Sequence, residues 1–284
     1  GPVTERSIQA RVRDVVGDLP AAQQRVAELA VADPEALAFG TAQTVAERTG
    51  TSAPTVLRFA AALGFDGYTS LRDAVRIELS NRLRSAAARL QQPVDAPLFT
   101  RTRRAELANV EETLAGLDPD AVERVVGWLA AGERRVWVLP SSQLAGVGSR
   151  FADELSLVRS RVRLVEGAEF RIHTALAGVE TGDVLVTFDI QRHEAWLVRA
   201  QRSAIGRGAM PVAVTDRLPC SLDLTGGVAL TFATETPGPF ESQVGAMVVA
   251  NLLVNGVVDL DRAGLASRID VLEQAWRETG QFDG

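Results

Sequence analysis

The pattern of residues 41–68 predicts two short helices joined by a tight turn. Few residue types accept the backbone conformation of such a turn. The first segment ends at Gly50, the residue type that best tolerates the left-handed backbone of a tight turn. The second begins at Ser52, a favourable N-cap, and Pro54 stands in its first turn, where a missing N–H is tolerated. Apolar side chains then recur at helical spacing and predict a buried face: Val56, Phe59, Ala60 and Leu63. This pattern predicts a helix-turn-helix over residues 41–65.

In such a motif the start of the second helix faces the edges of DNA bases. We expect Thr55 and Arg58 to project from the face opposite the apolar one, with Ser52 beside them. A hydroxyl can serve either strand, and arginine can bond guanine through two N–H groups. Residues that flank the second helix are candidates for phosphate contacts: Gln43, Thr44 and Tyr68.

Structural roles remain open for the same side chains. Ser52 and Thr44 could serve only as helix caps. Arg58 could serve only as the partner of a carboxylate such as Asp66. The motif around Arg58 favours a contact with DNA.

The chain has 284 residues, enough for two domains with separate cores. Residues 1–104 carry 14 arginines against 11 acidic residues, whereas the rest carries 16 against 25. A basic N-terminal part and an acidic remainder are typical of a protein whose N-terminal part binds nucleic acid. No apolar run approaches the ~20 residues that span a bilayer, and the single cysteine, Cys220, suits a reducing compartment. We therefore expect a cytoplasmic protein that binds no membrane.

Helical periodicity predicts a compact all-α domain over residues 3–90, which includes a long last helix from Ser70 to Leu90. Two prolines and weak periodicity over residues 91–100 are typical of a linker, which we assign to residues 91–104.

Residues 105–284 contain five short apolar runs that alternate with helix-length segments: Val136–Leu139, Val162–Val165, Val184–Phe188, Val212–Thr215 and Val228–Phe232. Runs buried on both faces are typical of a parallel sheet with helices on both sides. The predicted fold class is an all-α N-terminal domain followed by an α/β domain with a five-stranded parallel sheet. A long apolar helix (240–258) and an amphipathic tail around Ile269, Leu272 and Trp276 end the sequence.

The segment AERTGTSAPTVLRFAAALGFDGY resembles the helix-turn-helix of the RpiR/MurR-type bacterial transcriptional regulators. The matching positions are Val56, Arg58, Phe59, Leu63, Gly64, Phe65, Gly67 and Tyr68. NVEETLAGLD, followed by a helix and RRVWVL, resembles the entry to that family's sugar-isomerase (SIS) domain. The resemblance covers nearly the whole chain. It implies a dimeric or tetrameric regulator whose SIS domain senses a small metabolite, commonly a phosphosugar.

The expected ligand loops depart from the family pattern. In SIS domains two loops, each between a parallel strand and a helix, generally hold the ligand's phosphate, because free N–H groups and the helix dipole favour an anion. The first usually reads G-x-G-S-S; here it reads Pro140, Ser141, Ser142, Gln143 and Leu144. The second usually reads S-x-S-G-x-T; here it reads Asp189, Ile190, Gln191, Arg192, His193 and Glu194. A carboxylate about 4 Å from a phosphate charge is repelled by about 1 kcal/mol even in bulk water.

Three outcomes follow from these loops. Arg192 could neutralise a different anion, an uncharged or amine-bearing ligand could use Asp189 or Glu194, or sensing could be lost. We expect an altered ligand. The candidate ligand-binding residues are Ser141, Ser142, Gln143, Asp189, Gln191, Arg192, His193 and Glu241. Solvated helix starts are the structural alternative for these loops, and capping is the simpler role for Glu241.

The sequence favours a DNA-binding regulator that forms homo-oligomers on a pseudo-palindromic double-stranded site and responds to a small-molecule effector such as a sugar derivative. No cofactor is expected, and no metal, since no second His or Cys lies at ligand spacing from His193. One alternative is an SIS-fold isomerase, which would need intact phosphate loops and an acid–base pair. Another is a protein with a vestigial SIS domain that no longer senses anything.

Overall fold

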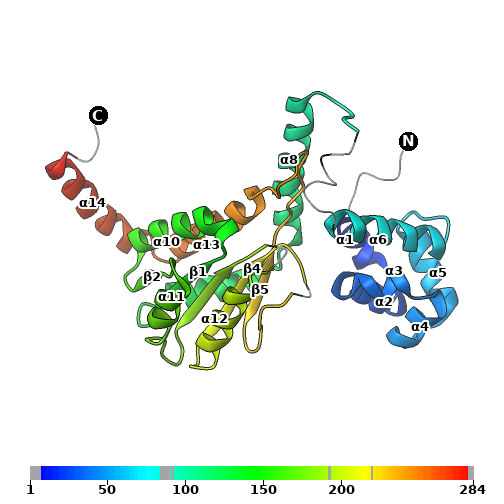
Figure 1. Cartoon of the computed structure of the whole chain (residues 1–284), viewed down its shortest axis with the longest axis horizontal. Helices are drawn as coiled ribbons and strands as arrows, with labels where there is room; N and C mark the ends of the chain where they lie inside the picture. The colour runs from blue at the N-terminus through cyan, green and yellow to red at the C-terminus, as the bar shows by residue number, and fades with distance from the viewer. Residues whose placement is uncertain (1–7, 84–89, 91–92, 191–192, 219, 281–284) are drawn as a thin grey trace. The chain divides into compact units, whose positions relative to one another are not determined.

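The computed structural model describes residues 8–83, 90, 93–190, 193–218 and 220–280 (Figure 1). The chain divides into two compact units, residues 1–101 with 236–240 and residues 102–235 with 241–284. Each unit has its own apolar core, as the chain length allows.

The first unit is all-helical, as predicted. Its helices are α1 (Ile8–Val15), α2 (Ala21–Ala32), α3 (Pro34–Phe39), α4 (Ala42–Thr49), α5 (Ala53–Ala62) and α6 (Tyr68–Leu83). The apolar face predicted for α5 is buried, because Val56, Phe59 and Ala60 are fully covered and Leu63 is 4% exposed. The long helix predicted to Leu90 is described to Leu83, and residues 84–89 lie outside the described residues.

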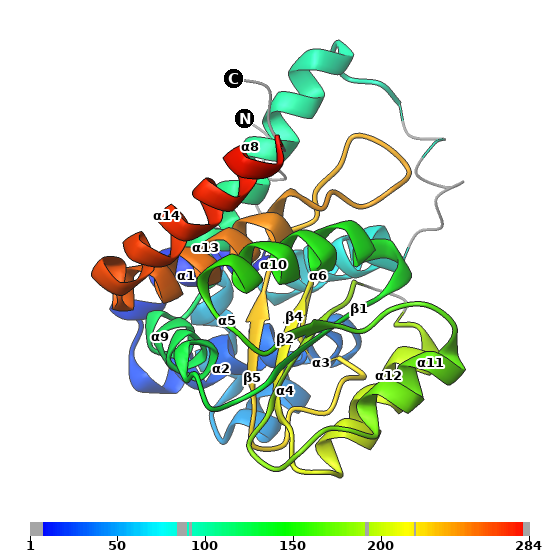
Figure 2. The ribbon, with the colours of Figure 1, turned by 90° about the vertical axis from the view of Figure 1, so that its left-hand side faces the viewer.

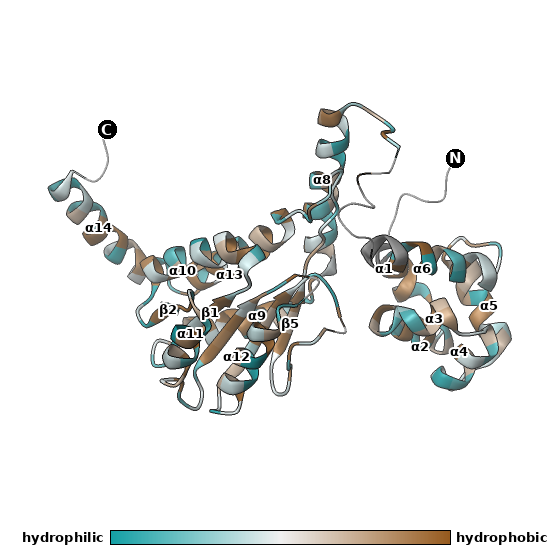
Figure 3. Cartoon of the chain, viewed as in Figure 1, coloured by the Kyte–Doolittle hydropathy of each residue, from teal (hydrophilic) through white to brown (hydrophobic). Residues whose placement is uncertain are grey.

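The second unit is built on the predicted five-stranded parallel sheet. Its strands are β1 (Val136–Pro140), β2 (Val162–Leu164), β3 (Val184–Phe188), β4 (Met210–Thr215) and β5 (Val228–Thr231), in the order β2-β1-β3-β4-β5. All four pairings are parallel. The apolar strands appear brown in Figure 3, as expected for strands buried on both faces.

Helices cover both faces of this sheet. Side chains from α9 (Pro119–Ala130), α10 (Ala145–Val158) and α13 (Val244–Leu260) pack on one face. Side chains from α11 (Glu169–Leu176) and α12 (Ala195–Ile205) pack on the other. Figure 2 shows α11 and α12 together on the side of the sheet away from α10 and α13.

Three expected boundaries differ from the structure. Helix α8 (Leu98–Gly116) starts directly after Pro97, so seven residues assigned to the linker are helical. The helix expected from residue 240 starts at Val244. The described residues between β4 and β5 form turns instead of a helix.

The last helix is α14 (Arg262–Thr279), and α13 meets it at a bend of 107°. None of the described helices is by itself long and apolar enough to cross a membrane; α13 and α14 meet that test only as a bent pair, by length and composition.

Candidate functional site

The turn between α4 and α5 has the predicted geometry. Gly50 adopts φ 61° and ψ 38°, the left-handed conformation that glycine accepts without strain. Arg25 of α2 donates to the carbonyls of Thr49 (3.0 Å) and Gly50 (3.2 Å). A cation at the end of a helix satisfies orphan carbonyls and complements the dipole. The position of α5 is therefore fixed from outside the motif as well as from within it.

The exposed start of α5 carries two of the three predicted base-reading side chains. Ser52 and Arg58 are exposed, but Thr55 is 6% exposed, so the prediction that Thr55 projects outward was wrong. Thr55 lies one helical turn before Phe59 and therefore shares its buried face. Its hydroxyl pairs with Ser52 Oγ at 3.0 Å and accepts from Arg58 Nη2 at 3.2 Å.

The structure bears on the structural roles left open for Ser52 and Arg58. Ser52 occupies the N-cap position of α5, but its side chain makes no capping hydrogen bond to the backbone. Within the described part of the chain, Arg58 donates to Thr55 and forms no ion pair with Asp66.

Tyr68 does not fit its predicted role at a phosphate. Its side chain is 6% exposed, and its hydroxyl donates to the carbonyls of Leu37 (2.9 Å) and Gly40 (3.1 Å). Burial raises the pKa of this phenol, while the charges of Arg72 and Arg76 lower it. The ring instead ties α6 to the end of α3.

Gln43 and Thr44 are exposed in the first turn of α4. The cap of α4 is Thr41, whose Oγ1 accepts from the Thr44 N–H at 3.1 Å. Gln43 donates to Glu47 at 3.0 Å. Both side chains are exposed and therefore accessible to a phosphate group.

The carboxyl ends of β1 and β3 meet at a change in strand order. From β1 the chain passes to β2 on one side, whereas β3 and β4 lie on the other. Ligands of open α/β sheets bind at such a point, outside the carboxyl ends of the strands. Ser141 and Asp189 directly follow these two strands, and the Ser141 N–H donates to Phe188 O at 2.8 Å. The two predicted ligand loops are therefore adjacent.

A carboxylate joins the two loops. Glu194, at the N-cap position of α12, accepts a hydrogen bond from the backbone N–H of Ser142 at 2.7 Å. Ser142 opens the 3-10 turn Ser142–Leu144 that leads into α10. The neighbouring Gln143 is exposed and is bound through its carbonyl by Gln243 Nε2 at 2.7 Å. An N–H at the start of this helical segment is thus already bonded to an anion of the chain itself.

Asp189 is turned into its own loop. Its side chain is fully buried, with Oδ1 accepting from Ile190 N at 2.8 Å and Oδ2 2.5 Å from His193 Nδ1. His193 is also largely buried, with 9% of its side chain exposed. Both carboxylate oxygens therefore have partners within the loop. Gln191 and Arg192, predicted to line the same site, lie outside the described residues.

Buried hydroxyls without partners lie along the same edge of the sheet. Ser141, Thr187 and Thr215 are each 0% exposed, and their side-chain oxygens form no hydrogen bond with any described residue. Thr187 is the penultimate residue of β3, and Thr215 is the last residue of β4. Since buried polar groups are normally satisfied, such a group indicates a missing partner. Neither threonine was predicted as a site residue, because both lie inside apolar runs.

Glu241 was expected in the first turn of the long apolar helix (240–258), but it lies before that helix, α13. Helix α13 begins three residues later, and the adjacent Ser242 Oγ accepts from Val244 N at 3.2 Å and donates to Glu106 at 2.6 Å. The loop before it is held by Asn109, which donates to Glu235 O at 2.8 Å and accepts from Glu235 N at 2.6 Å. Helix α8 therefore positions the segment that carries Glu241.

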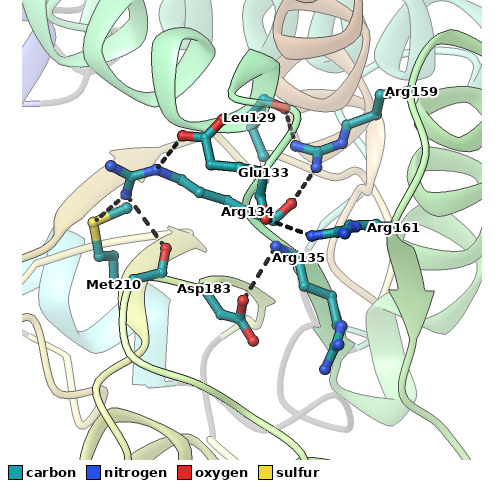
Figure 4. Close-up of polar contacts among 9 residues, drawn as sticks. Leu129, Glu133, Arg134, Arg135, Arg159, Arg161, Asp183 and Met210 are labelled. Atoms are coloured by element: carbon teal, nitrogen blue, oxygen red, sulfur yellow. Dashed lines mark hydrogen bonds and ion pairs between the residues drawn. The ribbon is translucent and has the colours of Figure 1, made fainter.

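The amino end of the sheet holds a second polar cluster (Figure 4). Asp183 accepts from Arg135 N (3.1 Å), Trp137 Nε1 (2.9 Å) and Glu180 N (3.0 Å). The Arg159 guanidinium, 7% exposed as a residue, donates to the carbonyls of Leu129, Arg134 and Ser160. Burial lowers the pKa of Arg159. These groups bind one another and the backbone, which is typical of a structural cluster.

Comparisons with known proteins agree with this geometry. Residues 7–82 match the model of the helix-turn-helix domain of the rpiR family. The HTH-type transcriptional regulator HexR of Pseudomonas aeruginosa is 24% identical over 266 residues, which cover 89% of each chain. Residues 7–82 are therefore a helix-turn-helix domain of the rpiR type, and the chain is similar over most of its length to a transcriptional regulator.

Solved structures show the same fold for this chain. NanR of Vibrio vulnificus, in a structure with ManNAc-6P, superimposes with a TM-score of 0.58 at 16% identity, over 96% of this chain and 99% of NanR. The sugar isomerase domain of an RpiR transcription factor from Sphaerobacter thermophilus gives a TM-score of 0.54 at 22% identity, over 62% of this chain and 96% of that one. The SIS fold that the resemblance implied is confirmed.

Proposed function

We propose that this RpiR-type regulator binds operator DNA as a homo-oligomer through α5 and responds to a small metabolite bound at the carboxyl ends of β1, β3 and β4. It acts as a regulator and not as an isomerase, because both loops lack the residues that usually hold the substrate's phosphate in such enzymes. The observation that carries the sensing proposal is the group of three buried hydroxyls that have no partner within the described ranges of the chain.

The DNA-reading surface consists of Ser52 and Arg58, with Thr55 as the residue that positions them. Thr55 bonds both side chains from the buried side and so restricts their rotamers. Restricting a long side chain before binding lowers the entropy lost in the complex. Gln43 and Thr44 add phosphate contacts from α4. Two such surfaces in a symmetric oligomer read a pseudo-palindromic site.

Arg58→Ala tests the DNA contact. We expect it to weaken binding to the DNA upstream of the protein's own gene by about 10- to 100-fold, since a good arginine–guanine pair contributes about 1–3 kcal/mol. Fluorescence anisotropy at 150 mM salt measures this. Arg150→Ala, an exposed arginine of the sheet unit, removes the same charge and should bind like the wild type. Unchanged affinity and sequence preference in Arg58→Ala would contradict the proposal.

The effector is a hydroxyl-rich metabolite, and no phosphate of the effector accepts a hydrogen bond from the Ser142 N–H. NanR was solved with ManNAc-6P, which supports a sugar derivative as the ligand class. In this chain the Glu194 carboxylate already accepts the hydrogen bond that a phosphate would take. A phosphate charge about 4 Å from that carboxylate is repelled by about 4 kcal/mol at an effective dielectric of about 20. A neutral polyol meets no such repulsion and can satisfy the buried hydroxyls.

The bonds of Asp189 change one earlier expectation. An amine-bearing ligand paired with Asp189 would have to displace Ile190 N and His193 from its two oxygens. Breaking a buried, fully bonded pair costs several kcal/mol. A neutral ligand leaves this pair intact and is therefore favoured.

A further inference from the structure

The last helix of the chain carries an apolar stripe at coiled-coil spacing. Leu265, Ile269, Leu272 and Trp276 follow one another at intervals of four, three and four residues. This is the spacing of the a and d positions in a heptad repeat. Leu265 and Leu272 then occupy d positions, and Ile269 occupies an a position.

Only the first part of α14 is attached to its own unit. Leu265 is 9% exposed, and Arg268 donates to Leu157 O at 2.6 Å and Ser156 O at 3.1 Å at the end of α10. Figure 1 shows that α14 runs away from the sheet and from α10 and α13 toward its C-terminal end. Ile269 and Leu272 remain partly exposed there, outside the apolar clusters of the core.

This second part is too short to be stable alone. Eleven residues follow Arg268 up to Thr279, and isolated helices below ~12–15 residues are marginal in water. Ile269 and Leu272 therefore require a surface to pack against.

We propose that α14 pairs in parallel with α14 of a second copy of this chain. A β-branched residue at a with leucine at d favours two parallel strands, which is the combination of Ile269 with Leu272. Arg268 at g stands five residues before Glu273 at e, so each Arg268 meets Glu273 of the partner subunit. Arg268 uses two N–H groups on α10, and a guanidinium has five.

This pairing deepens the proposed homo-oligomer by naming its contact. It spans about two heptads, so it reinforces other contacts between the copies instead of replacing them. It also fixes a two-fold axis along α14, which constrains how two copies can be arranged.

The test uses the full chain in sedimentation-velocity and cross-linking experiments. Ile269→Asp with Leu272→Asp should weaken self-association at least about tenfold, since two carboxylates would be buried without partners. Val271→Asp is the control, because Val271 is 67% exposed and lies off the stripe on the same helix. It should associate like the wild type.

Disulfide formation gives the direct readout of parallel pairing. In a Cys220→Ala background, Leu272→Cys should form a covalent dimer on oxidation, and Val271→Cys should not. A wild type that is oligomeric, with no effect of the aspartates and no Leu272→Cys dimer, would overturn the pairing while leaving the proposed homo-oligomer standing. Loss of association without a Leu272→Cys dimer would show that α14 docks elsewhere on the partner, which also overturns it. A monomeric wild type would overturn both.

Discussion

The two ends of the same sheet differ in how their buried polar groups are hydrogen-bonded. At the amino end, Asp183 accepts three hydrogen bonds and the Arg159 guanidinium donates to three carbonyls. At the carboxyl end, the hydroxyls of Ser141, Thr187 and Thr215 find no partner among the described residues. Buried polar groups with hydrogen-bond partners are typical of a structural role. Buried polar groups without partners are typical of a place where another molecule binds. This difference supports the proposal that the carboxyl end of the sheet holds the ligand site.

The contrast has an energetic consequence. A substitution at the amino end leaves several buried donors or acceptors without partners, whereas one at the carboxyl end can remove a polar group that has none. Stability should therefore fall at one end and hold or rise at the other.

The largest effect is expected for Asp183→Ala. This change leaves the N–H groups of Arg135, Trp137 and Glu180 without their acceptor, and we expect a loss of about 3–5 kcal/mol in the free energy of unfolding. Urea denaturation measures it. Asp183→Asn keeps one acceptor oxygen and should lose less; a loss below about 1 kcal/mol in Asp183→Ala would contradict the structural role.

Arg159→Met should have the next largest effect. Methionine keeps the apolar stem of the side chain but leaves the carbonyls of Leu129 and Arg134 unsatisfied, so we expect about 2–3 kcal/mol of destabilisation. Arg207→Met serves as the control at an exposed arginine. Equal denaturation midpoints for the two variants would show that the buried guanidinium is not needed.

Thr187→Val should change stability with the opposite sign. Valine has nearly the same shape and removes a buried hydroxyl without a partner, so we expect a gain of up to about 1 kcal/mol. The same variant should lose the response to any metabolite that stabilises the wild type. A clear loss of stability in the urea titration would mean that the hydroxyl is satisfied within the protein.

The smallest effect concerns Cys220, beside the carboxyl end. Burial raises the pKa of this thiol, and the charge of Asp189 raises it further. Because the thiolate is the reactive form, alkylation by iodoacetamide at pH 8 should be slower than for a free cysteine and should rise as the pH increases. Rates followed by mass spectrometry test this, and a free-cysteine rate in the folded protein would refute it.

The sequence predicts what local patterns determine. The helix-turn-helix depends on Gly50 and on apolar residues at helical spacing, and the strands depend on short apolar runs, so both were predictable. Thr55 was misplaced although its spacing of four from Phe59 puts both on one face. The linker was extended too far, although residues 98–104 contain no proline or glycine that would keep them out of a helix.

Non-local contacts could not be predicted in this way. The Tyr68 hydroxyl bonds carbonyls 31 and 28 residues away, and Glu194 reaches Ser142 across 52 residues. Whether Thr187 and Thr215 have partners depends on the neighbouring strands and helices. The two loops were therefore placed correctly after β1 and β3, but the bonds of Asp189 and Glu194 required the structure.

The most direct measurement is a thermal-shift comparison of the wild type, Glu194→Ala and Glu180→Ala, an exposed glutamate at the amino end. Each is titrated with inorganic phosphate, ManNAc-6P and the corresponding neutral sugar. We expect phosphate and ManNAc-6P to leave the Tm of the wild type and of Glu180→Ala unchanged and to raise that of Glu194→Ala, whose Ser142 N–H is free. A strong rise in the Tm of the wild type with ManNAc-6P would contradict the proposal that Glu194 holds the place of the phosphate.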